Sequence, residues 1–294
     1  MRALLLALLL AAAPASAQTI EDPEGTILGE GRKDGSEAGF RDWVTAFRAK
    51  ALEDGVPAAV YDREMRAAEY LPDVVRRDHS QTEFTKTIWD YLDIAVSDER
   101  VRLGRDAVAN HTALLERIEA EYGVDKEIVA AVWGLESAYG TWRGTTDTIS
   151  ALATLAYDGR RAAFFEGQLV QALKILSGGH VARKDMVGSW AGAMGHTQFM
   201  PSSWAEFAVD FDGDGRRDIW GDDPADALAS TANYLARMGW VKDQPWGMEV
   251  TLPQGFDYDQ TTERVVKLVE EWRAMGVAPA AGGVLPGDDD ASIL

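Results

Sequence analysis

Apolar residues recur at helical spacing over most of the chain between Ser36 and Arg237, and this pattern restricts the fold more than any other feature. The first such segment follows Ser36, a residue type that caps helices, and ends before Gly55 and Pro57. Its apolar face consists of Phe40, Trp43, Val44, Phe47 and Ala51. Little of the chain is left for a large sheet, so we expect a mainly α fold.

Further elements are expected along the chain. A second helix should run from Ala58 to Tyr70 and stop at Pro72. A third should carry His111, interpreted as a packed histidine, beside an apolar face made of Val101, Val108, Leu115 and Tyr122. The remaining expected elements are helices at 124–140, 150–176 (one or two), 224–237 and 262–272, and a strand at 249–252.

The chain begins with the features of a secretory signal peptide. Met1 and Arg2 precede an apolar run from Ala3 to Ala13, and a small-x-small pattern then predicts cleavage after Ala17. The alternative, a membrane anchor, needs about 20 apolar residues, roughly twice this run. Without cysteine there is no residue for an N-terminal lipid anchor and no disulfide framework. We therefore expect a periplasmic protein whose residues 1–17 are removed and whose residues 18–35 form a flexible tail.

The charge, the ligand-forming residues and the apolar runs argue against nucleic acid, zinc and a membrane span. The formal net charge is −19, whereas binding to nucleic acid requires clustered Lys and Arg. Four histidines and no cysteine also make a zinc site improbable. No apolar run after the signal peptide is long enough to span a membrane.

One glutamate lies on an apolar helical face. In the expected helix 124–140, Glu136 shares this face with Val129, Val132, Trp133 and Tyr139. No Lys or Arg occupies a neighbouring position there, so burial should raise the pKa of the carboxyl, as a general acid at neutral pH requires. The alternative is a structural glutamate that bonds the backbone or a distant arginine such as Arg143.

The segment from Gly188 to Trp204 combines glycine, serine and aromatic residues. It reads Gly-Ser-Trp-Ala-Gly-Ala-Met-Gly-His-Thr-Gln-Phe-Met-Pro-Ser-Ser-Trp. Glycines let the backbone approach a ligand closely, while polar groups and aromatic faces suit the hydroxyls and C–H faces of sugars. The alternative is an irregular loop that packs on the core.

Three motifs together resemble the membrane-bound lytic transglycosylase B family of lysozyme-like murein-cleaving enzymes. They are Leu135–Gly140, Gly188–Trp204, and Ala232–Leu235 with Gly239–Trp240. The resemblance runs in the same order from about Phe40 to the C-terminus. It implies an N-terminal helical region at 36–110, a lysozyme-like catalytic core at 111–245, and a small β-containing region at 246–294 that is shorter than in the family.

The resemblance also implies roles for individual residues. Glu136 matches the catalytic glutamate of the family. The matches to substrate-binding residues are Ser189, Gln198, Tyr234, and, by its spacing to Gly104, Tyr91. His196 stands where the family often has an aromatic residue, and we assign it to substrate binding with altered contacts.

A single carboxyl group suffices for the reaction that the resemblance implies. Glu136 would protonate the glycosidic oxygen between N-acetylmuramic acid (MurNAc) and N-acetylglucosamine (GlcNAc), and would then deprotonate the C6 hydroxyl of MurNAc. The product is a 1,6-anhydro end, and no catalytic cofactor is needed. Two alternatives remain: a muramidase that hydrolyses the same bond, and a non-catalytic glycan-binding or scaffold protein. The partner is the peptidoglycan glycan strand, and proteins of cell-wall synthesis or division are the candidate protein partners.

An aspartate-rich loop at 210–226 follows most of the calcium-loop template. Asp210, Asp212 and Asp214 fill its first, third and fifth positions, and Arg216 offers a backbone carbonyl at the seventh. The twelfth position is glycine rather than glutamate, and the resemblance favours Asp226 as the closing ligand. We expect a structural calcium ion, and the alternative is an Asp/Gly turn without metal.

Overall fold

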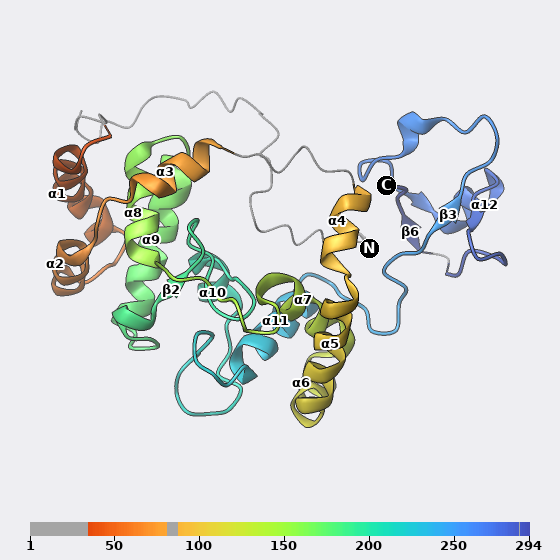
Figure 1. Ribbon diagram of the computed structural model, residues 1–294, viewed down its shortest axis with the longest axis horizontal. Helices are drawn as coiled ribbons and strands as arrows, with labels where there is room; N and C mark the ends of the chain where they lie inside the picture. The colour runs from red at the N-terminus through yellow and green to blue at the C-terminus, as the bar shows by residue number, and fades with distance from the viewer. Residues whose placement is uncertain (1–34, 81–87, 288) are drawn as a thin grey trace. The chain divides into compact units, whose positions relative to one another are not determined.

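The computed structural model describes residues 35–80, 88–287 and 289–294 (Figure 1). These residues divide into two compact units, and the boundary along the chain falls between Tyr234 and Leu235, within helix α11 (Ala225–Arg237). The large unit ends at Tyr234, and the C-terminal unit comprises residues 235–294. The signal peptide and the tail lie outside the described residues, and the domain boundaries expected from the sequence stay predictions.

Helices make up most of the large unit. Its two short strands, β1 (Thr146–Asp147) and β2 (Val187–Gly188), pair antiparallel, with Thr146 opposite Gly188. The helices are α1 (Glu37–Glu53), α2 (Ala58–Ala67), α3 (Pro72–His79), α4 (Ile88–Ala95), α5 (Asp98–Asn110), α6 (Thr112–Tyr122), α7 (Lys126–Ser137), α8 (Thr148–Asp158), α9 (Ala162–Ser177), the 3-10 helix η2 (Arg183–Asp185), α10 (Pro201–Phe207) and α11 (Ala225–Arg237).

The core of the large unit is built around α8 and α9, which lie side by side (Figure 1). The buried face of α1 packs against this pair, and the Ser36 side chain caps its first turn by accepting from the Gly39 N–H at 3.0 Å, as expected. Phe40 and Tyr157 meet edge to face within the core. Asp147 caps the start of helix α8, because its carboxylate accepts a hydrogen bond from the Ser150 N–H.

Two boundaries in the N-terminal helices differ from the expectation. Pro72 begins α3 instead of stopping the previous helix, because proline lacks an N–H and the first helical turn needs none. The expected single helix through His111 is two helices, α5 and α6. Its break is at His111, whose Nδ1 lies 3.0 Å from the Ala107 oxygen and whose ring packs edge-on against Trp133.

The C-terminal unit contains short strands around a small core. Strand β3 (Val250–Thr251) pairs antiparallel with β5 (Ala278–Pro279), and β4 (Lys267–Leu268) pairs antiparallel with β6 (Asp290–Ala291). The expected helix at 262–272 is mostly wrong, because residues 267–268 form β4 and only α12 (Val269–Ala274) is helical; a 3-10 helix, η3, spans Tyr258–Gln260. The buried core residues are Phe256, Trp272, Val277, Leu285 and Ile293.

The described elements are predominantly helical, and their strands are only two residues long. The mainly α fold that the sequence predicts is therefore confirmed. Within the part of the chain that the structure describes, no helix combines the length and apolarity needed to cross a membrane.

A buried ion pair gives a first prediction. Asp78, 1% exposed, binds Arg160 and Arg161; burial opposes its charged form, but the two guanidinium groups outweigh burial and hold its pKa below the ordinary value. Asp78→Asn should lower the free energy of unfolding by about 2–3 kcal/mol near pH 7, measured by urea denaturation. Because the pKa of Asp78 is lowered in the folded state, the difference in unfolding free energy between the wild type and Asp78→Asn should disappear as pH falls through that folded-state pKa.

The matched control is Asp106→Asn, which removes an exposed partner of Arg102 and should cost less than about 0.5 kcal/mol. Equal effects of the two substitutions would contradict a stabilising role for the buried pair.

Candidate active site

Glu136 lies in the last turn of α7 and is half-buried, whereas the sequence places it on a buried apolar face. Among the described residues, its carboxylate makes no hydrogen bond and no ion pair. Burial is the cause that raises its pKa from 4.5 to about 7. The expected direction of the pKa shift is confirmed, and a group with this pKa can both give and take a proton near neutral pH.

Helix α7 ends earlier than expected. Ser137 is its last residue, and Ala138, Tyr139 and Gly140 all have positive φ, at 48°, 60° and 80°. Two consecutive non-glycine residues in the left-handed region are uncommon and cost roughly 1–2 kcal/mol each. The turn takes Tyr139 off the helix, and its ring lies against Gly134, where a Cβ atom would collide with the tyrosine ring.

The end of α7 is fastened to the glycine-rich segment. Trp133 Nε1 donates to His196 Nδ1 at 3.1 Å, and Ser137 Oγ donates to the His196 backbone oxygen at 2.5 Å. Ser137 Oγ also accepts from the Gly140 N–H at 2.9 Å. These bonds connect residues on both sides of Glu136 to the segment that the sequence assigns to sugar binding.

Ser189 and Gln198 lie in that segment, close in sequence to this junction. Ser189 Oγ accepts from the Ala193 N–H at 3.0 Å, which leaves its own hydrogen available for donation. Gln198 has a φ of 52°, and its Nε2 donates to the Gly195 oxygen at 2.8 Å and to the Arg143 oxygen at 3.3 Å. In this part of the described chain its Oε1 accepts no hydrogen bond, so it can accept from a ligand.

The two tyrosines assigned to substrate binding differ in how far the structure describes them. Tyr234, on α11, is half-buried and packs edge-on against Phe207, with ring centroids 4.8 Å apart. The backbone of Tyr91 belongs to α4, but its side chain lies outside the described residues.

The structure does not support the assignment of His196 to direct substrate binding. Its side chain is 3% exposed. Nδ1 is taken by Trp133, and Nε2 lies 2.8 Å from the Gly221 oxygen. With both ring nitrogens bonded to protein groups, the ring has no polar atom left for a sugar hydroxyl. Burial could not be read from the sequence, because the residues around His196 come from distant segments.

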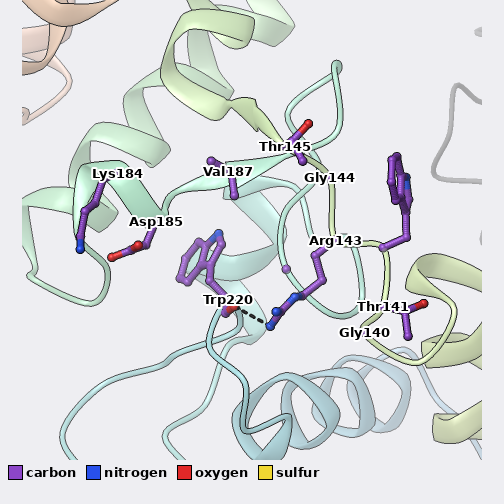
Figure 2. A pocket seen from close by; sticks show the side chains of 11 residues that line it. Gly140, Thr141, Arg143, Gly144, Thr145, Lys184, Asp185, Val187 and Trp220 are labelled. Carbon is purple, nitrogen blue, oxygen red and sulfur yellow. Dashed lines mark hydrogen bonds between the residues drawn. The ribbon is translucent and has the colours of Figure 1, made fainter.

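Arg143, the alternative partner of Glu136, is engaged elsewhere. Its guanidinium donates to the backbone oxygen of Trp220 at 2.8 Å (Figure 2). It also donates to the Gly221 oxygen and pairs with Asp222 at 3.1 Å. The structure therefore gives Glu136 no cationic partner in Arg143.

An open pocket of about 410 Å³ adjoins the turn after α7. Its lining comes from residues 140–145, from η2 and Val187, and from Gly195 and Trp220 (Figure 2). Trp142, also in the lining, is 72% exposed, and sequence reasoning missed it. The signal available was an aromatic residue between the glycines of the Gly-Thr-Trp-Arg-Gly stretch, an exposed loop position where a ring can stack on a sugar.

The aspartate-rich loop brings three carboxylates together. Oxygens of Asp210, Asp212 and Asp214 lie within 4.8 Å of one another, all exposed. Oxygen donors in such a group suit a hard cation, so these residues fit a calcium ion. Asp226, the expected closing ligand, does not belong to this group.

Asp226 instead holds the loop from within. It is 3% exposed, and its two oxygens accept from the N–H groups of Phe211 at 2.7 Å and Asp218 at 2.8 Å. The assignment of Asp226 as a metal ligand is therefore not supported. The spacing placed it correctly at the start of α11, but only the fold shows that backbone amides occupy it.

The chain is similar in sequence to known proteins. A family model described as "Transglycosylase SLT domain" matches residues 39–294. Over 148 residues the chain is 43% identical to membrane-bound lytic murein transglycosylase B of Escherichia coli (strain K12), covering 48% of this chain and 40% of that protein. The match thus spans less than half the length of that relative.

Solved structures are similar as well. SltB3 from Pseudomonas aeruginosa, in complex with NAG-NAM-pentapeptide, is 49% identical with a TM-score of 0.83, covering 87% of this chain and 69% of that one. The Escherichia coli lytic transglycosylase Slt35, in complex with calcium, is 30% identical with a TM-score of 0.73, covering 85% and 78%. The fold is that of the lysozyme-like lytic transglycosylases. The chain belongs to the transglycosylase SLT domain family, and the resemblance inferred from its motifs is confirmed.

Because the pKa of Glu136 is raised, replacing its carboxyl group should increase the free energy of unfolding. Between pH 4.5 and about 7 the native state binds more protons at this site than the unfolded state, so Glu136 lowers the free energy of unfolding as pH rises. Glu136→Gln should therefore stabilise the protein by about 1 kcal/mol at pH 8 and by less at pH 5, after allowance for solvent screening.

Urea denaturation at the two pH values measures this difference. Glu127→Gln, at an exposed position of the same helix, is the control and should give no such gain. An equal change at both pH values would argue against a carboxyl with a raised pKa.

Proposed function

We propose that the protein is a lytic transglycosylase that cleaves the MurNAc–GlcNAc bond of peptidoglycan and forms 1,6-anhydro-MurNAc ends. The observation that carries this proposal is the half-buried Glu136, without a partner among the described residues and with a pKa of about 7. The relatives support it, since SltB3 structures hold NAG-NAM-pentapeptide and NAG-anhNAM-pentapeptide.

Glu136 acts twice in this reaction. Its protonated form gives the proton to the glycosidic oxygen as the bond from C1 breaks, and GlcNAc leaves with a free hydroxyl. The resulting carboxylate then takes the proton of the MurNAc C6 hydroxyl, whose oxygen bonds to C1. The carboxyl recovers its proton and no water is consumed, so atoms and charge balance.

The surroundings of Glu136 favour this reaction over hydrolysis. Glycosidases of either stereochemistry use two carboxyl groups. Glu136 is the only acidic residue in 133–143, and the segment 188–204 contains none. A hydrolytic muramidase remains the second candidate, and it differs in leaving reducing ends.

We assign substrate contacts to polar and aromatic residues of the motifs and of the turn after α7. We assign the Ser189 hydroxyl and the Gln198 Oε1 to sugar hydroxyls or acetamido groups, and Tyr234 and Tyr91 to the walls of the glycan site. Trp142 is added as a stacking surface beside the turn after α7. The working compartment is the periplasm, with cleavage after Ala17, and peptidoglycan is the partner. Protein partners from cell-wall synthesis or division stay a prediction.

Asp210, Asp212, Asp214 and the Arg216 carbonyl are assigned to a structural calcium ion. The three carboxylates lie within 4.8 Å of one another, and Slt35 was solved in complex with calcium. A bound cation would offset their mutual repulsion and stabilise the loop.

Removal of the proton-transfer group tests the activity. Glu136→Gln keeps the side-chain volume but cannot exchange a proton, so release of anhydro-muropeptides from purified peptidoglycan should fall at least a hundredfold, because a positioned acid/base supplies about 10²–10⁴-fold. Circular dichroism should show the wild-type fold. A variant that keeps more than about a tenth of the wild-type rate would exclude Glu136 as the acid/base.

Calcium should raise the melting temperature of the metal-free protein, because a ligand that binds only the native state stabilises it. Asp210→Ala or Asp214→Ala should remove that rise, which differential scanning calorimetry measures. Asp42→Ala, at an exposed position on α1, should keep it. A melting curve that saturating calcium does not move would show that the loop is only a turn.

A further inference from the structure

His196 joins two distant segments of the large unit by four hydrogen bonds. On one side it accepts from Trp133 Nε1 and Ser137 Oγ, both in the last turns of α7. On the other side its backbone N–H donates to the Ile219 oxygen at 3.0 Å, and its Nε2 bonds the Gly221 oxygen at 2.8 Å. The ring is buried and is used by no step of the proposed reaction.

These partners fix the tautomer of the imidazole. An indole Nε1–H can only donate, so His196 Nδ1 must be unprotonated towards Trp133. The ring proton is then on Nε2 and points to the Gly221 oxygen. A second ring proton would face the indole N–H and add a positive charge beside Arg143, whose guanidinium lies 3.2 Å from Nε2. Burial is the main cause that lowers the pKa of His196, and the positive charge of Arg143 lowers it further.

We infer that His196 is a positioning residue for Glu136. It holds the last turn of α7 in place and so sets how far the Glu136 carboxyl is exposed to solvent. The inference rests on the proposed function only in naming Glu136 as the acid/base. Trp133 and Ser137 flank Glu136 in sequence, and the bonds from both end on His196. Glu136 has no hydrogen bond of its own among the described residues, so the turn that carries it sets its exposure.

The far side of His196 is itself rigidly held. Asp218 Oδ1 accepts from the N–H groups of Trp220 and Gly221, at 2.8 and 3.0 Å, and the Asp218 N–H donates to Asp226. The residues that receive the two His196 bonds, Ile219 and Gly221, therefore belong to the aspartate-rich loop and are held there by its internal hydrogen bonds. His196 therefore connects a fixed segment to the turn that carries Glu136. A residue that positions a catalytic group needs such a fixed support.

The experiment measures the titration of Glu136 itself. Proteins with ¹³C-labelled glutamate carboxyl groups are titrated by NMR, and the Glu136 signal is assigned by its absence in Glu136→Gln. His196→Phe keeps a ring but removes both side-chain bonds, and the midpoint for Glu136 should fall by about one pH unit as the carboxyl becomes more exposed. His196→Asn places an oxygen near Nδ1 that can still accept from Trp133, and it should keep the midpoint near the wild-type value.

Kinetics on soluble glycan strands give the second readout. In His196→Phe the kcat should fall about tenfold or more with KM little changed, since a misplaced catalytic group can cost about a hundredfold. His180→Phe is the matched control, because His180 also lies edge-on to a tryptophan, Trp204, at 4.8 Å, and among the described residues its hydrogen bond goes to Arg217 and not to α7. It should leave both readouts unchanged.

Further variants keep the inference falsifiable. If His196→Phe does not fold, Trp133→Phe removes the same bond from the other side and should lower the midpoint alike. An unchanged Glu136 midpoint in every folded variant that lacks the bond would overturn the inference. If the wild type forms no anhydro ends, the proposed function fails, while the NMR titration still decides whether His196 positions Glu136.

Discussion

The hydrogen bonds between the end of α7 and His196 are the interaction on which the site depends. They connect a helix whose last turn carries Glu136 to a segment that also carries Ser189 and Gln198. Without such a connection, a half-buried carboxyl that has no partner among the described residues would turn towards solvent, where its charged form is favoured. The raised pKa of Glu136 is thus a property of the packing around the helix end.

The backbone around Glu136 adopts energetically unfavourable conformations. Ala138 and Tyr139 adopt left-handed conformations directly after the helix, and Gln198 does so in the facing segment. Unfavourable backbone geometry next to an unpaired carboxyl is the pattern expected where function, and not stability, sets the local structure. Packing in the helical core around α8 and α9 stabilises the fold enough to offset this unfavourable backbone geometry.

Local patterns allowed some of the fold and site to be predicted, and their failures have physical causes. Ser36 correctly marked the start of α1, because capping is a property of adjacent residues. Pro72 was misinterpreted because it suits the first turn of a helix as well as a break. The apolar face correctly indicated the raised pKa of Glu136. The hydrogen bonds that His196 and Asp226 make to protein groups could not be predicted, because most of their partners lie outside the local sequence pattern.

The central claim, that one carboxyl group transfers a proton twice and water takes no part, is tested most directly by isotope labelling. Purified peptidoglycan is digested with the protein in H₂¹⁸O, and the released muropeptides are analysed by mass spectrometry. The account predicts products with the mass of 1,6-anhydro-MurNAc and no ¹⁸O. Reducing ends that carry one ¹⁸O at C1 would contradict it and would show that the protein hydrolyses the bond.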